Sequence, residues 1–150
     1  MSKKGQLPSF QQCLRMMRKH DPQVQEDGYH YLLAQAPVYL DQLIAQFEVE
    51  EDIGVRRWLL ELIGETRSLA ALPLLTECLR SDDEYLRRWA MWGLKTINTK
   101  EARRTLWEAR SYTFATEEET QEFRHALEAV AGLDRGGANR GSASGRCLTG

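Results

Sequence analysis

The chain contains an internal repeat with a period of 31 residues. Val55-Arg-Arg-Trp-Leu-Leu returns as Leu86-Arg-Arg-Trp-Ala-Met. Self-similarity at a period of about 20 to 50 residues is typical of stacked supersecondary units, each of which buries its apolar face against its neighbours. Such stacks present an extended surface rather than an enclosed pocket. The repeat therefore predicts an architecture first, and it favours binding over catalysis.

The same register extends towards the N-terminus. Val24 takes the position of Val55 and Leu86, and an aspartate stands three residues before each of them. This predicts three units, each an acidic turn followed by two helices, over residues 22–50, 51–81 and 82–111. In the first unit Gln25, Glu26 and Asp27 replace Arg-Arg-Trp, as is typical of a terminal repeat.

The second helix of each unit carries three apolar residues at spacings of four and three, which places them on one helical face. These are Leu40, Ile44 and Phe47, then Ala71, Leu75 and Cys78, then Ala102, Leu106 and Ala109. Capping helices are predicted on both sides, within 8–20 after Ser9 and over 117–131 after Thr116, whose spacing to Glu119 is that of a capping box. Residues 1–131 are expected to form one all-α domain, and the Gly- and Ser-rich residues 132–150 a flexible tail.

Composition narrows the classes of function. The net charge of −2 gives no overall attraction to nucleic acid, although the charge is uneven: residues 1–20 contain basic side chains and no acid, whereas 117–128 contain five glutamates. No apolar run reaches the length of about 20 residues that spans a bilayer, and no signal peptide is apparent. We expect a soluble cytoplasmic protein without a membrane partner.

No catalytic or metal-binding motif is apparent. The three cysteines are far apart without a Cys-x-x-Cys pair, and the three histidines are scattered, so neither a metal nor a cofactor is expected. Cys78 occupies a predicted core position, and we interpret it as a small hydrophobic residue rather than a nucleophile. The sequence also lacks a phosphate-binding glycine loop and a Ser-His-Asp set, so an enzyme is not expected.

The repeat resembles HEAT-like repeats, most closely the short class named after phycobilisome lyases. The residues that carry the resemblance are Asp52, Val55, Arg56, Ile63, Gly64, Ala71, Pro73, Leu74, Leu75 and Leu79, and then Asp83, Leu86, Arg87, Ala90, Leu94, Ala102 and Leu106. The resemblance implies a right-handed α-solenoid, or superhelix, of about three helical hairpins whose second helices line a concave face. It also implies ion pairs between the acidic turn and the repeat arginines, here Asp52 with Arg56 and Asp83 with Arg87.

The differences between repeats indicate where a partner would bind. Trp58 and Trp89 recur and are predicted to lie in the core. The counterparts of Trp92 and Trp107 are Glu61 and Thr76, so these two tryptophans are the better candidates for an exposed contact. The arginine pairs at 56/57, 87/88 and 103/104 form either a basic ladder for phosphate or an acidic partner, or structural contacts; nearby acids favour the structural reading. The predicted partner-binding residues on the concave face are Gln42, Gln46, Glu77, Arg104, Trp107 and Glu108.

Three hypotheses of function follow. The first is a non-enzymatic module, such as an adaptor, assembly factor or immunity protein, that binds another protein. The second, from the resemblance alone, is a bilin lyase-like protein that handles a tetrapyrrole. The third is a nucleic-acid-binding protein, which the acidic balance disfavours.

Overall fold

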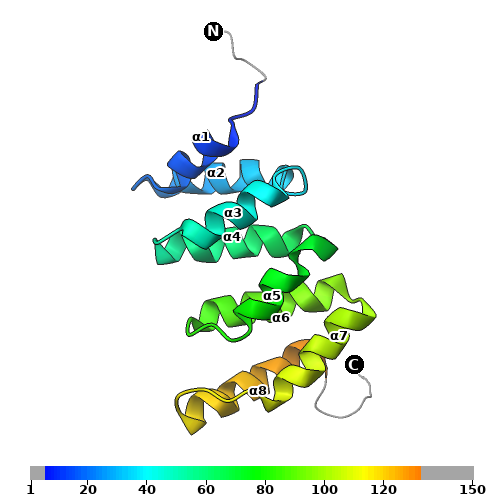
Figure 1. The fold of residues 1–150 in the computed structure, drawn as a ribbon. Helices are drawn as coiled ribbons and strands as arrows, with labels where there is room; N and C mark the ends of the chain where they lie inside the picture. The colour runs from blue at the N-terminus through cyan, green and yellow to red at the C-terminus, as the bar shows by residue number, and fades with distance from the viewer. Residues whose placement is uncertain (1–5, 133–150) are drawn as a thin grey trace, which may run out of the picture. The chain divides into compact units, whose positions relative to one another are not determined.

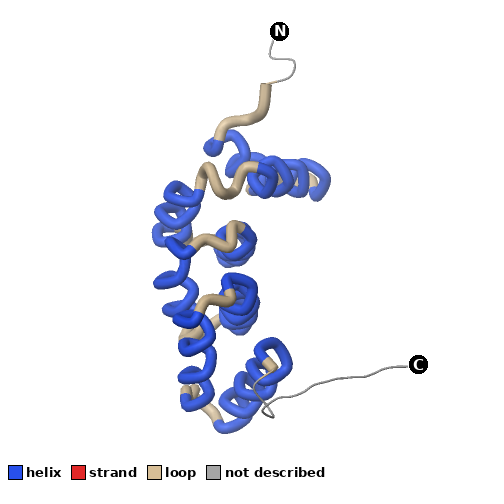
Figure 2. Tube along the Cα trace, turned by 90° about the vertical axis from the view of Figure 1, so that its right-hand side faces the viewer, coloured by secondary structure: helices blue, strands red, loops and turns tan. Residues whose placement is uncertain are grey.

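The computed structural model describes residues 6–132, and these contain eight α-helices, two 3₁₀ helices and no strand (Figures 1 and 2). Backbone contacts divide the chain into two compact units, Met1–Ala71 and Leu72–Gly150. The first holds α1 (Phe10–Met17), α2 (Pro22–Ala34), α3 (Leu40–Val49), α4 (Ile53–Glu65) and η1 (Leu69–Ala71). The second holds α5 (Leu72–Cys78), α6 (Glu84–Ile97), α7 (Lys100–Glu108), η2 (Ala109–Ser111) and α8 (Glu117–Ala131). The predicted tail lies outside the described residues from position 133 onward.

Helices α1 and α8 begin directly after Ser9 and Thr116, whose hydroxyls cap them. Ser9 and Gln12 form a full capping box at α1, where the Ser9 hydroxyl accepts from Gln12 N at 3.1 Å. At α8 the Thr116 hydroxyl accepts from Glu119 N at 3.0 Å, and three glutamates occupy the first turn, where the helix dipole favours negative charge.

The recurring aspartates cap the first helix of each predicted unit. The carboxylates of Asp21, Asp52 and Asp83 accept from Gln23 N, Val55 N and Tyr85 N, at 2.9, 3.0 and 2.9 Å. An N-cap of this kind stabilises a helix by about 1 kcal/mol because it satisfies an otherwise unpaired N–H group. The acidic turn of the repeat is therefore a helix-start signal.

The repeat arginines bind the turn that these aspartates close. Arg56 Nη1 donates to Phe47 O at 2.8 Å, and Arg87 Nη1 donates to Ser81 O at 2.8 Å. Phe47 lies in the last turn of α3, whereas Ser81 lies in the turn that follows α5. Each arginine therefore also binds a backbone carbonyl beside the acidic turn, and the Phe47 carbonyl is one of those that lack an intrahelical donor at a helix C-terminus.

The backbone repeats at one further point that the sequence does not show. Arg67 follows α4 and Asn98 caps α6, and both have φ of 54°, in the left-handed region. The two positions are 31 residues apart, although their side chains differ. The left-handed residue ends the first helix of the unit and turns the chain towards the second.

The tightest helix pairs are those joined by the acidic turns. In the first unit α3 packs closely on α4, and in the second α5 packs closely on α6, whereas α2 and α3 make few close backbone contacts. Short turns hold each of these pairs together. These pairs lie on either side of the turns that contain Asp52 and Asp83, and α6 also packs on α7.

Most predicted core positions are buried. The three apolar trios of the second helices are buried, except that Ile44 is half-buried. The prediction that Trp58 and Trp89 lie in the core is wrong: both are half-buried. An indole on the edge of a helix pair keeps one side against solvent while the other side contacts an aromatic neighbour.

Candidate functional site

The second unit presents the exposed face of α7. Thr99 caps this helix, and Ala102, Leu106 and Ala109 bury its inner face, since α7 packs on α6. The remaining positions therefore point outward. Three of the predicted binding residues, Arg104, Trp107 and Glu108, are exposed there on consecutive turns, and 55% of the Trp107 surface is accessible to solvent.

Trp107 forms a stacked pair with Arg110. The Arg110 guanidinium carbon lies 4.3 Å from the centre of the Trp107 ring, within the range of a cation–π contact. Arg110 Nε is buried and has no hydrogen-bond partner among the described residues. The indole therefore contributes to holding this guanidinium in place, and together they form an aromatic and cationic patch.

The other residue predicted in this unit is Glu77. It lies on α5, whose inner face is formed by Leu74, Leu75 and Cys78, and its own side chain is exposed. Cys78 is 5% exposed, as its core assignment predicts.

The two predicted binding residues of the first unit, Gln42 and Gln46, differ in their exposure to solvent. Gln42 is exposed on α3, whereas Gln46 is half-buried and donates from Nε2 to Glu50 Oε1 at 2.8 Å. The amide of Gln46 is thus used within the fold. Gln42 keeps an accessible side chain on this helix.

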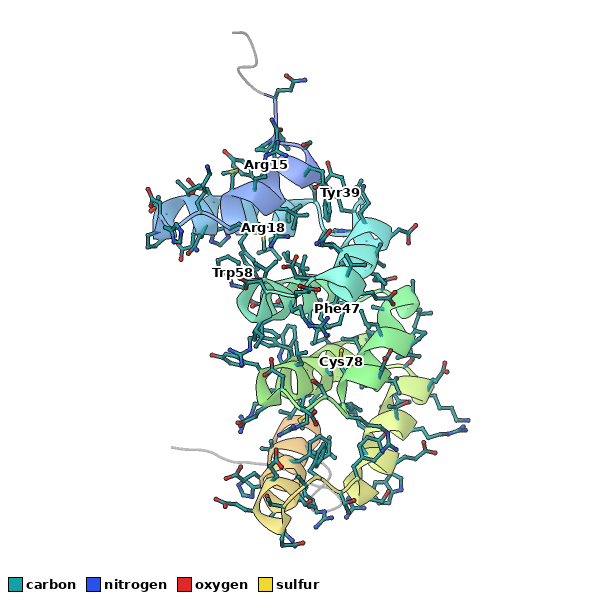
Figure 3. The ribbon with its side chains drawn as sticks, turned by 60° about the vertical axis from the view of Figure 1, so that its left-hand side comes forward. Arg15, Arg18, Tyr39, Phe47, Trp58 and Cys78 are labelled. Atoms are coloured by element: carbon teal, nitrogen blue, oxygen red, sulfur yellow. The ribbon has the colours of Figure 1, made fainter. Side chains whose placement is uncertain are left out.

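Glu50 is the centre of a buried polar network that sequence reasoning missed. Arg18 grips it with two hydrogen bonds, Nη1 to Oε2 at 2.9 Å and Nη2 to Oε1 at 2.6 Å, and Asp52 N donates to Oε2 at 3.1 Å. The hydrogen bond from Arg18 is the largest cause that lowers the pKa of Glu50 to about 2. Figure 3 shows Arg18 between α1 and the α3–α4 pair. The partners are 32 residues apart, so no local pattern signals the contact.

Comparison with known proteins identifies the family. The sequence profile of HEAT repeats matches residues 40–131, more than half of the chain. The chain belongs to the HEAT-repeat family. The match begins where α3 begins and ends where α8 ends.

A solved structure supports the same fold. This HEAT-repeat protein is similar to a chain in the structure of the complex of CpcE and CpcF of phycocyanin lyase from Nostoc sp. PCC7120, with a TM-score of 0.55 and 19% identity. The similarity covers 88% of this chain and 56% of that chain. No curated protein sequence matches significantly. The fold is thus an all-α solenoid of HEAT repeats.

Three other arginines of this HEAT-repeat protein have structural contacts. Arg87 is 4% exposed, lies 4.6 Å from the Phe114 ring and 4.0 Å from a Glu119 carboxylate oxygen. Arg80 lies 3.7 Å over the Tyr112 ring. These contacts, and the ion pair of Arg88 with Glu84 at 3.3 Å, favour the structural reading of the arginines over a phosphate ladder.

The described residues offer no metal site and no membrane-spanning helix. In residues 6–132, no group of three or more His, Cys, Asp and Glu side chains is placed to hold a metal ion. Among the same residues, no helix is both long and apolar enough to cross a bilayer. Cys13 is fully buried, and burial raises its thiol pKa, which disfavours the reactive thiolate.

Proposed function

We propose that this HEAT-repeat protein is a non-enzymatic protein–protein interaction module, of the adaptor, assembly or immunity type. Its partner binds the exposed face of α7 through Arg104, Trp107 and Glu108. Glu77 on α5 and Gln42 and Gln46 on α3 are further proposed contacts, with Gln46 limited by its bond to Glu50. The exposure of Trp107 carries the proposal.

An exposed tryptophan that is not needed to pack its helix is the strongest sign of a binding face. Three small or branched apolar residues already fix α7 on α6, so Trp107 adds little to that packing. Leaving it more than half exposed forgoes about 1 to 2 kcal/mol of burial. Tryptophan and arginine are also the residue types that most often dominate the energy of an interface.

The surroundings of Trp107 resemble the rim of an interface. Arg104 and Glu108 lie on consecutive turns beside it and carry opposite charges, and both are exposed. A central aromatic residue with a charged, solvated rim matches the anatomy of transient protein interfaces. The structurally similar protein is itself described in a complex of two proteins, which supports this class of function.

The test compares partners captured from extracts of the native host. The double variant Trp107→Ala, Arg104→Glu is expected to lose a partner that the wild type captures. A matched control, Val38→Ala with Lys95→Glu, changes an exposed apolar and an exposed basic residue elsewhere and should retain that partner. The captured protein is then purified and titrated, and Trp107→Ala alone should weaken binding by about 30-fold, as for a hot-spot residue of about 2 kcal/mol. Identical partner profiles for all three proteins would reject the α7 face.

The bilin and nucleic-acid hypotheses have direct tests. At 19% identity the similarity to a lyase subunit extends to the fold alone, so a bilin is added to the purified protein and its absorbance is recorded. An unchanged spectrum eliminates chromophore handling. A salt-dependent shift of duplex DNA would instead favour nucleic-acid binding.

A further inference from the structure

A second candidate surface is a cleft at the N-terminal cap of the first unit. It has a volume of about 740 Å³ and lies between the segment before α1, the outer side of α1, and the α2–α3 connection. Its lining residues are Gln6, Leu7, Pro8, Ser9, Gln12, Arg15, Met16, Lys19, Gln35 and Tyr39. None of the residues that the sequence analysis proposed for binding lies in it.

The lining is positively charged. Arg15 and Lys19 are both exposed, stand four residues apart, and face the cleft, and none of the ten lining residues is acidic. Arg18 is not available to a ligand in the cleft, because its Nη2 lies 2.6 Å from Glu50 Oε1 in an ion pair. Two of the three cations at this end of α1 are therefore available to an anion.

The lining is also partly apolar. Leu7 is 55% exposed, and Pro8, Met16 and Tyr39 are half-buried beside it. The Tyr39 ring is fixed by Phe10, with ring centres 5.5 Å apart, and Phe10 is a core residue of α1. Figure 3 shows Arg15 on α1 and Tyr39 just before α3. The apolar wall is thus anchored to the fold, and the charges stand next to it.

We propose that this cleft binds an acidic peptide segment of a partner protein, with an apolar side chain of the segment on Leu7 and Tyr39 and its carboxylates on Arg15 and Lys19. The proposal rests on the proposed function in that both take the chain to be a protein-binding module. It concerns a different unit and different residues, so the two can fail separately.

Two other occupants fit less well. The exposed start of α8 in a second copy offers Glu118 and Glu122, but exposed ion pairs contribute only about 0 to 1 kcal/mol each, and that helix face brings no apolar residue to Leu7. Nucleic acid would find two cations here, whereas tight backbone binding typically neutralises about 6 to 10 phosphates. An acidic segment with an apolar anchor uses both properties of the cleft.

The test is fluorescence anisotropy with the full chain and a labelled short peptide in which glutamate pairs flank one phenylalanine. Arg15→Glu with Lys19→Glu should weaken binding at least about tenfold, because two attractive charges become repulsive. Leu7→Ser should weaken it about threefold. Lys95→Glu with Lys100→Glu changes the net charge equally in the second unit and should bind within a factor of about two of the wild type. Thermal unfolding of each variant checks that the fold is retained, and Arg15→Gln with Lys19→Gln replaces the reversal if it is not.

Several outcomes would overturn the proposal. They are no binding of the probe, equal binding of a peptide with lysine in place of glutamate, and unchanged affinity in both cleft variants. Concentration-dependent self-association that the Arg15 and Lys19 changes abolish would assign the cleft to a second copy instead. An oligonucleotide that binds through the same residues while the peptide does not would assign it to nucleic acid. Trp107→Ala should leave peptide binding unchanged, so failure here does not affect the α7 proposal.

Discussion

The two units share the same repeated pattern of helices and caps, but different side-chain contacts hold their helices together. In the first unit the turn after α3 contains Glu50, buried under Arg18 and Gln46. In the second unit the equivalent position is Ser81, and the fold is closed instead by stacked aromatic and cationic groups. There Tyr112 stacks on Phe123 with ring centres 6.0 Å apart, and Phe114 contacts Phe123 at 4.8 Å.

The recurring tryptophans show the same difference. Trp58 contacts the Tyr29 ring at 5.4 Å, and the Tyr29 hydroxyl donates to Glu61 at 2.7 Å. Trp89 contacts Trp92 at 5.7 Å, edge to face, and Trp92 is the counterpart of Glu61. Burial and the bond to Glu61 raise the pKa of Tyr29, which stays neutral and can act as a donor. The repeats thus share their helix caps and backbone turns, whereas the side-chain contacts differ from one repeat to the next.

The largest expected loss of stability is at Arg87, and it should exceed the loss at its repeat counterpart Arg56. Arg87→Ala should lower the free energy of unfolding by about 3 kcal/mol, because a buried guanidinium loses its bond to Ser81 O and its contact with Phe114. Arg56 is only half-buried, so Arg56→Ala should cost about half as much, although Arg56 also binds a backbone carbonyl, that of Phe47. Urea unfolding followed by circular dichroism measures both. Equal losses of stability would mean that the bond to the backbone carbonyl alone sets the contribution of each arginine. This would contradict the proposed difference between the two units.

Gly28 tests the packing of the N-terminal capping helix α1 on α2, in the first unit. A Cβ on this residue would lie 2.8 Å from both Cys13 O and Met16 Cβ, because α1 crosses α2 there. Gly28→Ala should therefore destabilise by about 2 kcal/mol, against a gain of about 1 kcal/mol for alanine at an open helix position. Its repeat counterparts, Leu59 and Ala90, carry side chains. Gly54→Ala is the control, since its Cβ would meet only the Asp52 carboxylate at 3.3 Å and should be close to neutral. A stabilised Gly28→Ala variant would contradict the crossing.

Acid should weaken the first unit through Glu50. Its folded pKa of about 2 lies below the ordinary value of 4.5, so its contribution is complete above pH of about 5 and is lost as the pH falls towards 2. Because Arg18 is 42% exposed, solvent screens its ion pair with Glu50, and we expect this pair to contribute about 2 kcal/mol to the free energy of unfolding. Unfolding free energies of Glu50→Gln should depend less on pH over this window than those of the wild type. Glu51→Gln, an exposed neighbour, should behave like the wild type.

The smallest effect concerns the two left-handed residues. Arg67→Gly should raise stability by about 0.5 kcal/mol, because glycine adopts a φ of 54° without steric cost. Asn98→Gly should be close to neutral, since asparagine tolerates this conformation and its Oδ1 accepts from Arg103 Nη1 at 3.2 Å. Differential scanning calorimetry resolves the two midpoints. A gain at Asn98 equal to that at Arg67 would show that the side-chain bond contributes nothing.

The sequence by itself determined the helical class, the repeat register, the family and the helix starts. These follow from local physics: the spacing of apolar residues places them on one face, and Ser9, Asp52 and Thr116 cap the N–H groups directly after them. The exposure of Trp107 also followed, because the neighbouring trio ending in Ala109 already filled the inner face of α7.

Only the tertiary structure decided which distant side chains meet. Arg18 and Glu50, and Tyr29 and Glu61, are each 32 residues apart, and nothing in a local pattern selects one partner among many. The half-buried state of Trp58, the internal role of Gln46 and the charged cleft at α1 depend on the same long-range packing. Periodicity fixes which face of a helix is buried, but the neighbour that covers this face is chosen by how the helices pack.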